Sequence, residues 1–191
     1  MPTSEHWQIP RVLDVLASER PDTLLDVGAG YGKYGCLARE YASPTRVDGV
    51  DAVSPRIAAY DHFYLGDLRE LARLLPPEAP RYDLALLIDV IEHFEKEDGH
   101  RLLAELLRRA RRVLIATPWG FRAQQVAGTP YETHRSGWFP WDFWRRYRVH
   151  HLRIFPGRRT RRLRLPRLWQ IVALVSARES GPRPAAPAVG R

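Results

Sequence analysis

The segment at residues 22–35, DTLLDVGAGYGKYG, joins a short apolar run to a turn with glycine at alternate positions. An apolar run of this length that ends in glycine is typical of a strand buried on both faces of a sheet. Residues 32–41, which follow directly, have the pattern of a helix. A strand that turns into a helix within so few residues predicts an α/β fold, in which buried strands alternate with helices.

Further apolar runs continue this alternation along the chain. Short runs predict strands at 46–52, 62–67, from 82 to near Asp89, and at 111–120. Apolar residues at helical spacing predict helices at 4–19, 68–75, 98–110 and 141–147. Two last runs, 150–155 and 167–177, predict an antiparallel hairpin. The alternation predicts a mostly parallel sheet with helices on both faces, whose ligands bind at the carboxyl ends of the strands.

The length of 191 residues fits one domain, which we predict at residues 1–177. The tail at 178–191 contains three prolines and little apolar surface to bury, which predicts disorder. No run of 18 apolar residues and no N-terminal signal pattern occurs, and Cys36 has no second cysteine to pair with. We therefore expect a cytoplasmic protein without stable insertion into a membrane.

The net charge of +8 conceals an asymmetry along the chain. Residues 1–100 carry ten Lys and Arg against 18 Asp and Glu, whereas residues 101–191 carry 20 Arg against four acids. Ten of these arginines lie within residues 145–167, which contain no acid. Such a segment predicts either an anionic partner, such as RNA or a phosphorylated metabolite, or an edge hairpin that uses charge against strand pairing.

Glycine at positions 28, 30 and 32 lets the backbone take positive φ angles and approach a ligand closely. The spacing is G-x-G-x-G, and Lys33 stands where an enzyme that binds a nicotinamide dinucleotide has its third glycine. Asp26, two residues before the turn, indicates instead a site for a ligand with a positive charge or an amino group.

Acidic residues also follow the next three predicted strands. Asp51 lies 21 residues after Gly30, a distance at which a carboxylate commonly accepts hydrogen bonds from ribose hydroxyls. Asp67 follows the third strand, where a carboxylate can accept a hydrogen bond from an adenine amino group, and Asp89 ends the fourth. One acid at a strand end is typical of a helix cap, but four at successive strand ends favour one shared ligand site.

The segments LLDVGAGYGKYG, GVDA, YLGDL and YDLALLIDVIEHF together resemble the class I S-adenosylmethionine-dependent methyltransferases, over about residues 22–120. The resemblance implies an α/β fold with a Rossmann-like, doubly wound, mostly parallel seven-stranded sheet and a C-terminal antiparallel hairpin. It also implies S-adenosylmethionine as the cofactor. The segment at 53–62 departs from the family because it is too short for a full helix.

Carried over by position, the resemblance implies roles for the residues of the cofactor site. The implied cofactor contacts are Asp26, Gly28, Gly30, Tyr31, Asp51, Ala52, Asp67, Leu68, Asp89 and Val90. Asp26 would lie near the methionine amino group, and Asp51 would hold the ribose hydroxyls. Asp67 would contact the adenine, and Asp89 would border the methionine end.

The stretch at 116–143 begins at the end of the fifth predicted strand and is rich in tryptophan, glycine, proline and polar residues. Long segments of this composition beside a site are often lids, so we predict a lid over the acceptor at about 119–140. The predicted acceptor contacts are Trp119, Gln124, Tyr131, Glu132 and Trp138. Alternatively, these aromatic residues only seal the open end of the domain.

Two histidines are candidates for the general base that an oxygen or an acidic nitrogen acceptor needs. His134 lies in the predicted lid, and His93 follows the fourth strand. An amine acceptor needs no base. His150 and His151 alternate along a predicted strand, so we expect that they cannot bind one metal from the same face. No Cys/His spacing suggests zinc, and we predict no metal site.

These patterns favour a methyltransferase that acts on an oxygen or nitrogen atom of a small molecule, such as a sugar or a secondary metabolite, including anionic or phosphate-bearing ones. The alternative is an RNA methyltransferase that uses the Arg-rich hairpin at 145–167, although DVIE stands where enzymes acting on planar amines of nucleic acid have DPPY or NPPY. A non-catalytic binding module is disfavoured by the intact glycines and acids, and a nicotinamide oxidoreductase by Lys33.

Overall fold

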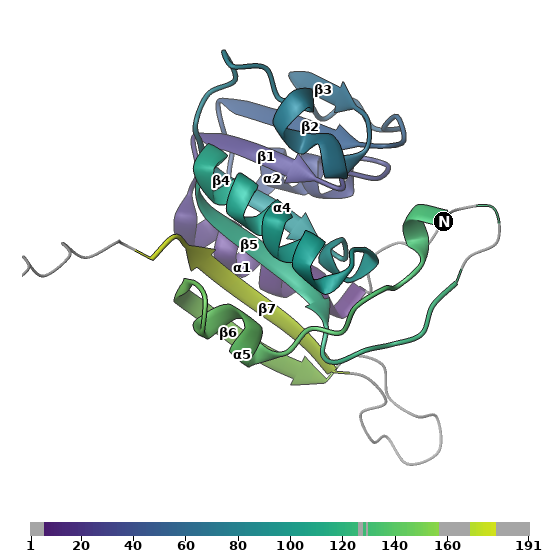
Figure 1. Ribbon diagram of the computed structural model, residues 1–191. Coiled ribbons are helices and arrows are strands. Elements are labelled where there is room, and N and C mark those ends of the chain that lie inside the picture. Colours follow the sequence, from purple (N-terminus) through teal and green to yellow (C-terminus); the bar gives the residue numbers. More distant parts are fainter. Residues whose placement is uncertain (1–5, 126–127, 129, 157–168, 179–191) are drawn as a thin grey trace, which may run out of the picture.

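The computed structural model describes residues 6–125, 128, 130–156 and 169–178, and a seven-stranded sheet forms its centre (Figure 1). The strands are β1 (Thr23–Val27), β2 (Arg46–Asp51), β3 (His62–Leu65), β4 (Tyr82–Ile88), β5 (Ala110–Pro118), β6 (Arg148–Pro156) and β7 (Trp169–Ser176). Their order is β3-β2-β1-β4-β5-β7-β6. Strands β1 to β5 pair in parallel, and β7 runs antiparallel to both β5 and β6. The predicted fold class is confirmed.

The strand order reverses between β1 and β4. From β1 the chain runs outward through β2 to β3, and it then returns to the other side of β1 through β4 and β5. In an open parallel sheet a crevice forms at such a reversal, at the carboxyl ends of the strands. The topology therefore brings the loops after β1, β2, β4 and β5 to one edge of the sheet (Figure 1).

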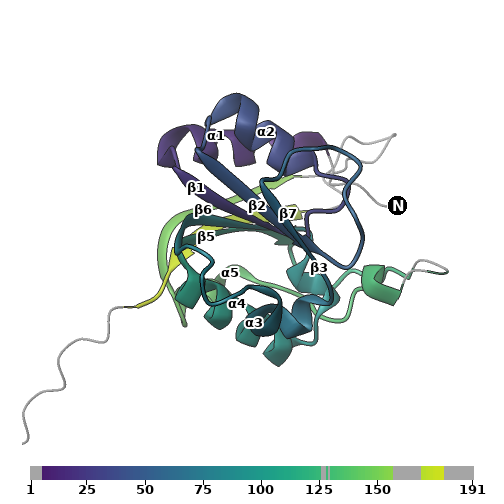
Figure 2. The ribbon, with the colours of Figure 1, turned by 90° about the horizontal axis from the view of Figure 1, so that it is seen from above.

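Helices cover both faces of the sheet (Figure 2). α1 (Ile9–Glu19) and α2 (Lys33–Tyr41) lie on one face, and α3 (Leu71–Leu74), α4 (Lys96–Arg109) and α5 (Pro140–Trp144) lie on the other. Short 3₁₀ turns are η1 (His6–Gln8), η2 (Leu68–Glu70), η3 (Ile91–His93) and η4 (Pro130–Glu132). Residues 52–61 form no helix, in agreement with the short length of this segment.

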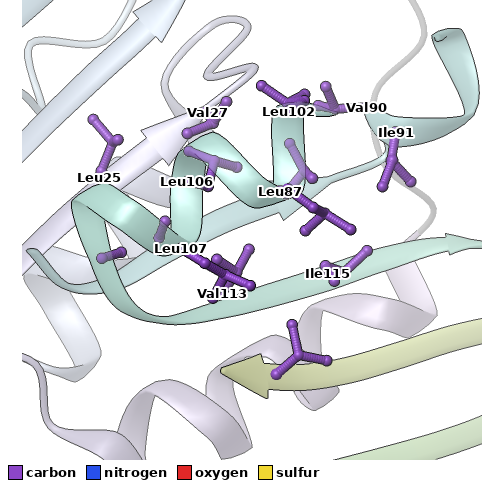
Figure 3. Packing of buried hydrophobic residues seen from close by; sticks show 14 of the residues in the cluster. Leu25, Val27, Leu87, Val90, Ile91, Leu102, Leu106, Leu107, Val113 and Ile115 are labelled. Carbon is purple, nitrogen blue, oxygen red and sulfur yellow. The ribbon is translucent and has the colours of Figure 1, made fainter. Parts of the chain in front are cut away.

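An apolar cluster fills the space on each side of the sheet. The cluster under α4 includes Leu87, Leu102, Leu106, Val113 and Ile115 (Figure 3). The cluster under α1 includes Val12, Leu16, Leu24, Leu86 and Leu114. Successive residues of a strand point to opposite faces, and for this reason the neighbours Leu86 and Leu87 belong to different clusters. Both faces of β1, β4 and β5 are therefore buried, which explains their continuous apolar runs.

The C-terminal hairpin departs from strict alternation near its start. A register irregularity lies between Val149 and His151, and both His150 and His151 line one hollow beside α1. The expectation that these histidines face opposite sides therefore does not hold, because a bulge interrupts the two-residue period. The Arg-rich turn at 157–168 and the tail at 179–191 lie outside the described residues.

In the part of the chain that the structure describes, no helix has both the length and the apolar character needed to cross a membrane.

Candidate functional site

A cavity of about 690 Å³ opens at the carboxyl edge of the sheet, at the reversal of strand order. One half is lined by the loops after β1, β2 and β3, and the other by η3 and by parts of the segment 118–135. The predicted site residues in the lining are Gly28, Gly30, Tyr31, Asp51, Ala52, Asp67, Leu68, Asp89, Val90, His93, Gln124, Tyr131, Glu132 and His134. Asp26, Trp119 and Trp138 lie outside the lining. The volume is typical of a site for a small ligand or cofactor.

The glycine turn after β1 forms one wall of the first half. Gly28, Gly30 and Gly32 have φ angles of 76°, 55° and 100°, which side-chain-bearing residues rarely adopt. A Cβ atom on Gly28 would lie 2.2 Å from Cγ2 of Val90. The missing side chain at this position therefore lets the turn pack directly against the end of β4.

Asp51 is fixed at the end of β2 by two backbone amides. Its Oδ2 accepts a hydrogen bond from the amide of Gly30 at 2.8 Å, and its Oδ1 accepts one from Val53 at 2.9 Å. These contacts tie the glycine turn to the end of the neighbouring strand. The carboxylate borders the cavity in an orientation fixed before any ligand arrives.

Asp67 lies after β3 at the start of η2. Its carboxylate accepts hydrogen bonds from the backbone amide of Arg69 at 2.9 Å and from the Arg69 guanidinium at 2.6 to 3.0 Å. These contacts with Arg69 lower the pKa of Asp67. Asp67 therefore remains an ionised hydrogen-bond acceptor at the cavity wall.

Asp26 lies beneath the glycine turn, where its side chain is almost fully buried. Burial raises the pKa of its carboxyl to about 6, although a hydrogen bond from the Tyr60 hydroxyl at 2.7 Å opposes the shift. Asp26 does not line the cavity, although its carboxyl lies near Asp51, which does. Its contact with a ligand amino group stays a prediction.

Tyr60 is a site residue that the sequence did not reveal. Cβ atoms on Gly35 and Gly49 would lie 2.5 and 2.8 Å from atoms of the Tyr60 ring. The two glycines therefore form the slot that lets the phenol reach Asp26. The sequence contains one indirect signal, because a strand and a helix do not themselves need a glycine. Gly49 lies in the second strand and Gly35 in the helix after the turn.

Asp89 connects the end of β4 with the N-terminal turn η1. It has a φ angle of 53°, which is uncommon for a residue with a side chain and is often found at functional sites. The side-chain amide of Gln8, a buried residue of η1, donates a hydrogen bond to Asp89 Oδ2. Gln8 is a second residue that the sequence analysis missed, because nothing local places it beside β4.

Glu92, His93 and His134 meet in the second half of the cavity. The rings of His93 and His134 have centroids 4.9 Å apart, although 41 positions separate them in the sequence. One ligand atom from each of the three residues lies within 4.8 Å of the others. The backbone explains the meeting, because the carbonyl of Glu92 accepts hydrogen bonds from the amides of Arg135 at 2.8 Å and Ser136 at 3.1 Å.

The tautomers of the two histidines follow from their backbone contacts. Nδ1 of His134 lies 2.8 Å from the carbonyl of Arg122, and Nδ1 of His93 lies 3.3 Å from the carbonyl of Thr133. A carbonyl only accepts hydrogen bonds, so Nδ1 carries the proton in both rings. Nε2 of His134 is left with a lone pair, whereas the ring of His93 also contacts the backbone of Asp89.

Burial shifts the pKa values of all three side chains. It lowers the pKa of His134 to about 4 and also lowers the pKa of His93, so both imidazoles are neutral at neutral pH. Burial raises the pKa of Glu92, and the nearby carboxylate of Asp89 adds to this shift. These groups are therefore held in a poorly solvated part of the cavity.

The two tryptophans predicted to contact the acceptor lie elsewhere. Trp138 is fully buried, and its indole N–H donates to the hydroxyl of Ser136 at 2.9 Å and to the carbonyl of Ile91 at 3.3 Å. Its ring occupies the space left by Gly99, where a Cβ would lie 2.6 Å from it. Trp119 is 39% exposed and packs edge-on against Trp169. Aromatic character alone did not distinguish a core residue from one that lines a pocket.

The segment between β5 and α5 is held in place near α5. The amide of Gly120 donates a hydrogen bond to the carbonyl of Trp138 at 2.7 Å, which joins the beginning of the segment to its end. Lys96 of α4 donates to the carbonyl of Gly137 at 2.6 Å and to Oδ2 of Asp142 at 2.5 Å, and it lies 3.9 Å from the centroid of the Trp138 ring.

Two hydrogen-bond acceptors in the cavity lining have no hydrogen-bond partner among the described residues. They are Oε1 of Gln170, whose side chain is almost fully buried, and Oε2 of Glu132. A buried acceptor without a donor costs free energy until a ligand supplies one. Arg122 and Arg135 also line this half. A polar ligand with hydroxyl or amino groups therefore fits this half of the cavity.

Comparison with known proteins identifies one family model that matches the chain. This model is described as a methyltransferase domain, and it matches residues 6–163. No curated protein matches the sequence.

Solved structures share the fold at low sequence identity. The PH0226 protein from Pyrococcus horikoshii has a TM-score of 0.60 and 16% identity, over 90% of this chain and 88% of its own. The 1,6-didemethyltoxoflavin-N1-methyltransferase of Burkholderia thailandensis, with bound S-adenosylhomocysteine, has a TM-score of 0.62 and 19% identity, over 90% and 80%. The magnesium protoporphyrin IX methyltransferase of Synechocystis, with bound S-adenosylmethionine, has a TM-score of 0.61 and 14% identity, over 90% and 79%.

Proposed function

The chain belongs to the methyltransferase domain family, and from this premise we propose that it transfers a methyl group from S-adenosylmethionine to an oxygen or nitrogen atom of a small molecule. One feature carries the proposal. A single cavity joins a half built from glycines and strand-end acids to a half lined by histidines and unpartnered polar groups. A donor and an acceptor can therefore meet in one enclosed space.

The first half fits S-adenosylmethionine on its own geometry. The glycine turn at Gly28 and Gly30 lines the cavity directly with backbone. Asp51 would accept hydrogen bonds from the ribose hydroxyls, and Asp67 with the amide of Leu68 would contact the adenine, which their positions in the cavity lining support. Asp89 and Val90 border the methionine end. Asp26 would contact the amino group at that end.

When bound, S-adenosylmethionine supplies the methyl group, so that the acceptor atom bonds to the methyl carbon while the carbon–sulfur bond breaks with both electrons going to sulfur. The chain's own residues hold the two reactants in line at close range, which is the main contribution that an enzyme makes to such a displacement. His93 and His134, which line the cavity side by side, would take the proton of an acceptor hydroxyl.

The second half supports a polar small molecule as the acceptor. Gln170 Oε1 and Glu132 Oε2 have no hydrogen-bond donor within the described part of the chain, and a hydroxylated sugar or secondary metabolite would supply one to each. Arg122 and Arg135 in the lining favour an anionic or phosphate-bearing form of it. Gln124 and Tyr131 complete this wall, and residues 119–140 act as the acceptor lid of a domain that spans residues 1–177.

Two variants test the two halves separately by calorimetry with S-adenosylhomocysteine. Asp51→Ala is expected to weaken binding about 100-fold, because it removes charge-assisted hydrogen bonds of about 1.5–3 kcal/mol each. His134→Ala is expected to keep the affinity within about twofold but to slow turnover on any hydroxylated acceptor that the wild type methylates.

The matched control is Asp14→Ala, an exposed acid of α1 outside the cavity, which should bind like the wild type. Folded wild-type protein that takes up neither S-adenosylmethionine nor S-adenosylhomocysteine would contradict the proposed function. Methylation of RNA in place of small molecules, weakened steeply by salt, would replace the proposed acceptor class.

A further inference from the structure

The cluster of Glu92, His93 and His134 has a composition and geometry that a proton-transfer role alone does not require. We propose that these three residues bind one divalent transition-metal cation at the acceptor end of the cavity. The binding of the cation stands independently of methyl transfer, whereas its catalytic role rests on the proposed function. The sequence predicted no metal site, because no local spacing brings Glu92 and His93 close to His134.

The distances allow all three residues to reach one ion. Their ligand atoms lie within 4.8 Å of one another. Three atoms at this spacing share a centre about 2.8 Å from each, and metal bonds to imidazole nitrogen and carboxylate oxygen are about 2.0–2.2 Å long. Inward shifts of somewhat less than about 1 Å for each side chain therefore complete the site.

The histidines are oriented as metal ligands usually are. A histidine that binds a metal through one nitrogen commonly donates the other N–H to a backbone carbonyl, which fixes the ring. Nδ1 of His134 is held in this way by Arg122, and Nδ1 of His93 by Thr133. Nε2 of His134 keeps the lone pair that a cation requires, and His93 would bind the cation by giving up its second backbone contact, with the carbonyl of Asp89.

Glu92 supplies a buried carboxylate that lacks a cation of its own. Its side chain is 3% exposed, and Oε2 accepts one hydrogen bond from the hydroxyl of Thr117 at 2.9 Å. Among the described residues, no ion pair reaches this side chain, and the nearby Arg135 pairs with Glu95 instead. A bound cation would give the buried side chain the charged partner that it lacks.

The ligand set selects the class of metal. Two imidazoles and one carboxylate suit Mn²⁺, Fe²⁺, Co²⁺ or Zn²⁺, whereas Mg²⁺ and Ca²⁺ prefer oxygen ligands. Three protein ligands leave positions open for a substrate. A hydroxyl that takes such a position becomes more acidic and can release its proton to water near neutral pH. A metal at this site therefore favours an acceptor with a hydroxyl group, which is methylated on its oxygen atom.

The test uses the full chain, treated with EDTA and then titrated calorimetrically with Mn²⁺, Co²⁺, Zn²⁺ and Mg²⁺. One transition-metal ion per chain is expected, with Mg²⁺ weaker. Glu92→Gln and His134→Ala should each weaken binding by about 100-fold or more, because even the partners of metal ligands contribute 10- to 100-fold. His62→Ala, at an exposed histidine on β3, should bind as the wild type does.

A second measurement does not depend on whether the variants fold. In the ¹⁵N-labelled wild type, Mn²⁺ is expected to broaden the imidazole NMR signals of His93 and His134 while the signal of His62 stays sharp. Absence of stoichiometric uptake, equal uptake by the variants, or unselective broadening would each overturn the proposal. S-adenosylhomocysteine binding by the same EDTA-treated protein separates the two hypotheses, since its loss contradicts the proposed function and its retention without metal uptake contradicts only this inference.

Discussion

Asp26 shows how one buried carboxyl makes stability depend on pH. Its pKa rises from the ordinary 3.8 to about 6 in the folded state because the group is buried under the glycine turn. Between about pH 4 and pH 6 the folded chain keeps a proton that the unfolded chain has already released. The free energy of unfolding therefore falls as pH rises through this window and is lowest, for this group, above pH 6.

Asp26→Asn is therefore expected to be more stable than the wild type at pH 7, by up to about 3 kcal/mol, and to match it near pH 4. The amide oxygen of Asn can still accept the hydrogen bond from Tyr60. Urea unfolding at pH 4, 5, 6 and 7 measures the difference. Tyr60→Phe, which removes the hydrogen bond but leaves the carboxyl, should instead be less stable than the wild type at pH 7. Parallel pH profiles for Asp26→Asn and the wild type would contradict this account.

At the scale of elements, α4 holds the segment that carries the acceptor side of the cavity. Lys96, in the first turn of α4, binds the carbonyl of Gly137 and the carboxylate of Asp142 and lies against the ring of Trp138. Arg146 reaches the same helix through an exposed ion pair with Glu97 at 3.4 Å. The two contacts join the same part of the chain to α4 but differ in burial.

Lys96→Met is expected to reduce the hydrogen-exchange protection of residues 134–143 by about 30-fold, since loss of charge-assisted hydrogen bonds costs about 2 kcal/mol. Arg146→Met is the matched control and should change protection less than about threefold, because exposed ion pairs contribute little. Affinity for S-adenosylhomocysteine should stay unchanged in both. Equal protection in the two variants would show that Lys96 does not anchor this segment.

At the scale of the whole molecule, the two apolar clusters share their strands. Leu86 and Leu87 are neighbours in β4, both fully buried, and each belongs to a different cluster. If the helices on one face came away, the apolar side chains on that face of the shared strands would be exposed to water, and the strands would no longer support the cluster on the other face. We therefore expect the described sheet and its helices to unfold as one cooperative unit.

Leu86→Ala and Leu87→Ala test this expectation as a matched pair. Each is expected to lower the free energy of unfolding by about 2–5 kcal/mol. In both variants the urea transitions followed by far-ultraviolet circular dichroism and by tryptophan fluorescence should coincide. A second transition in either variant would mean that the two faces of the sheet unfold separately.

The fold and the cofactor half were predictable from the sequence because their signals are local. An apolar run that ends in glycine determines a strand and its turn, and parallel strands bring their carboxyl ends to one edge whatever their side chains are. Asp51 and Asp67, which end or directly follow their strands, therefore reach the cavity that their positions predicted. Asp26 does not line the cavity, because the side chain of a residue inside a strand points to one face of the sheet, where it packs against the layer beneath.

Contacts between distant segments were decided only by the tertiary structure. Tyr60 reaches Asp26, Gln8 reaches Asp89, and His134 reaches Glu92 across long stretches of chain. Trp138 fills the core instead of the cavity because Gly99 of α4 leaves space for its ring. The sequence by itself determined the strands, the turn and the edge at which the site lies. The path of residues 119–140, and with it the cluster at the acceptor end, depends on packing and on hydrogen bonds that no local pattern encodes.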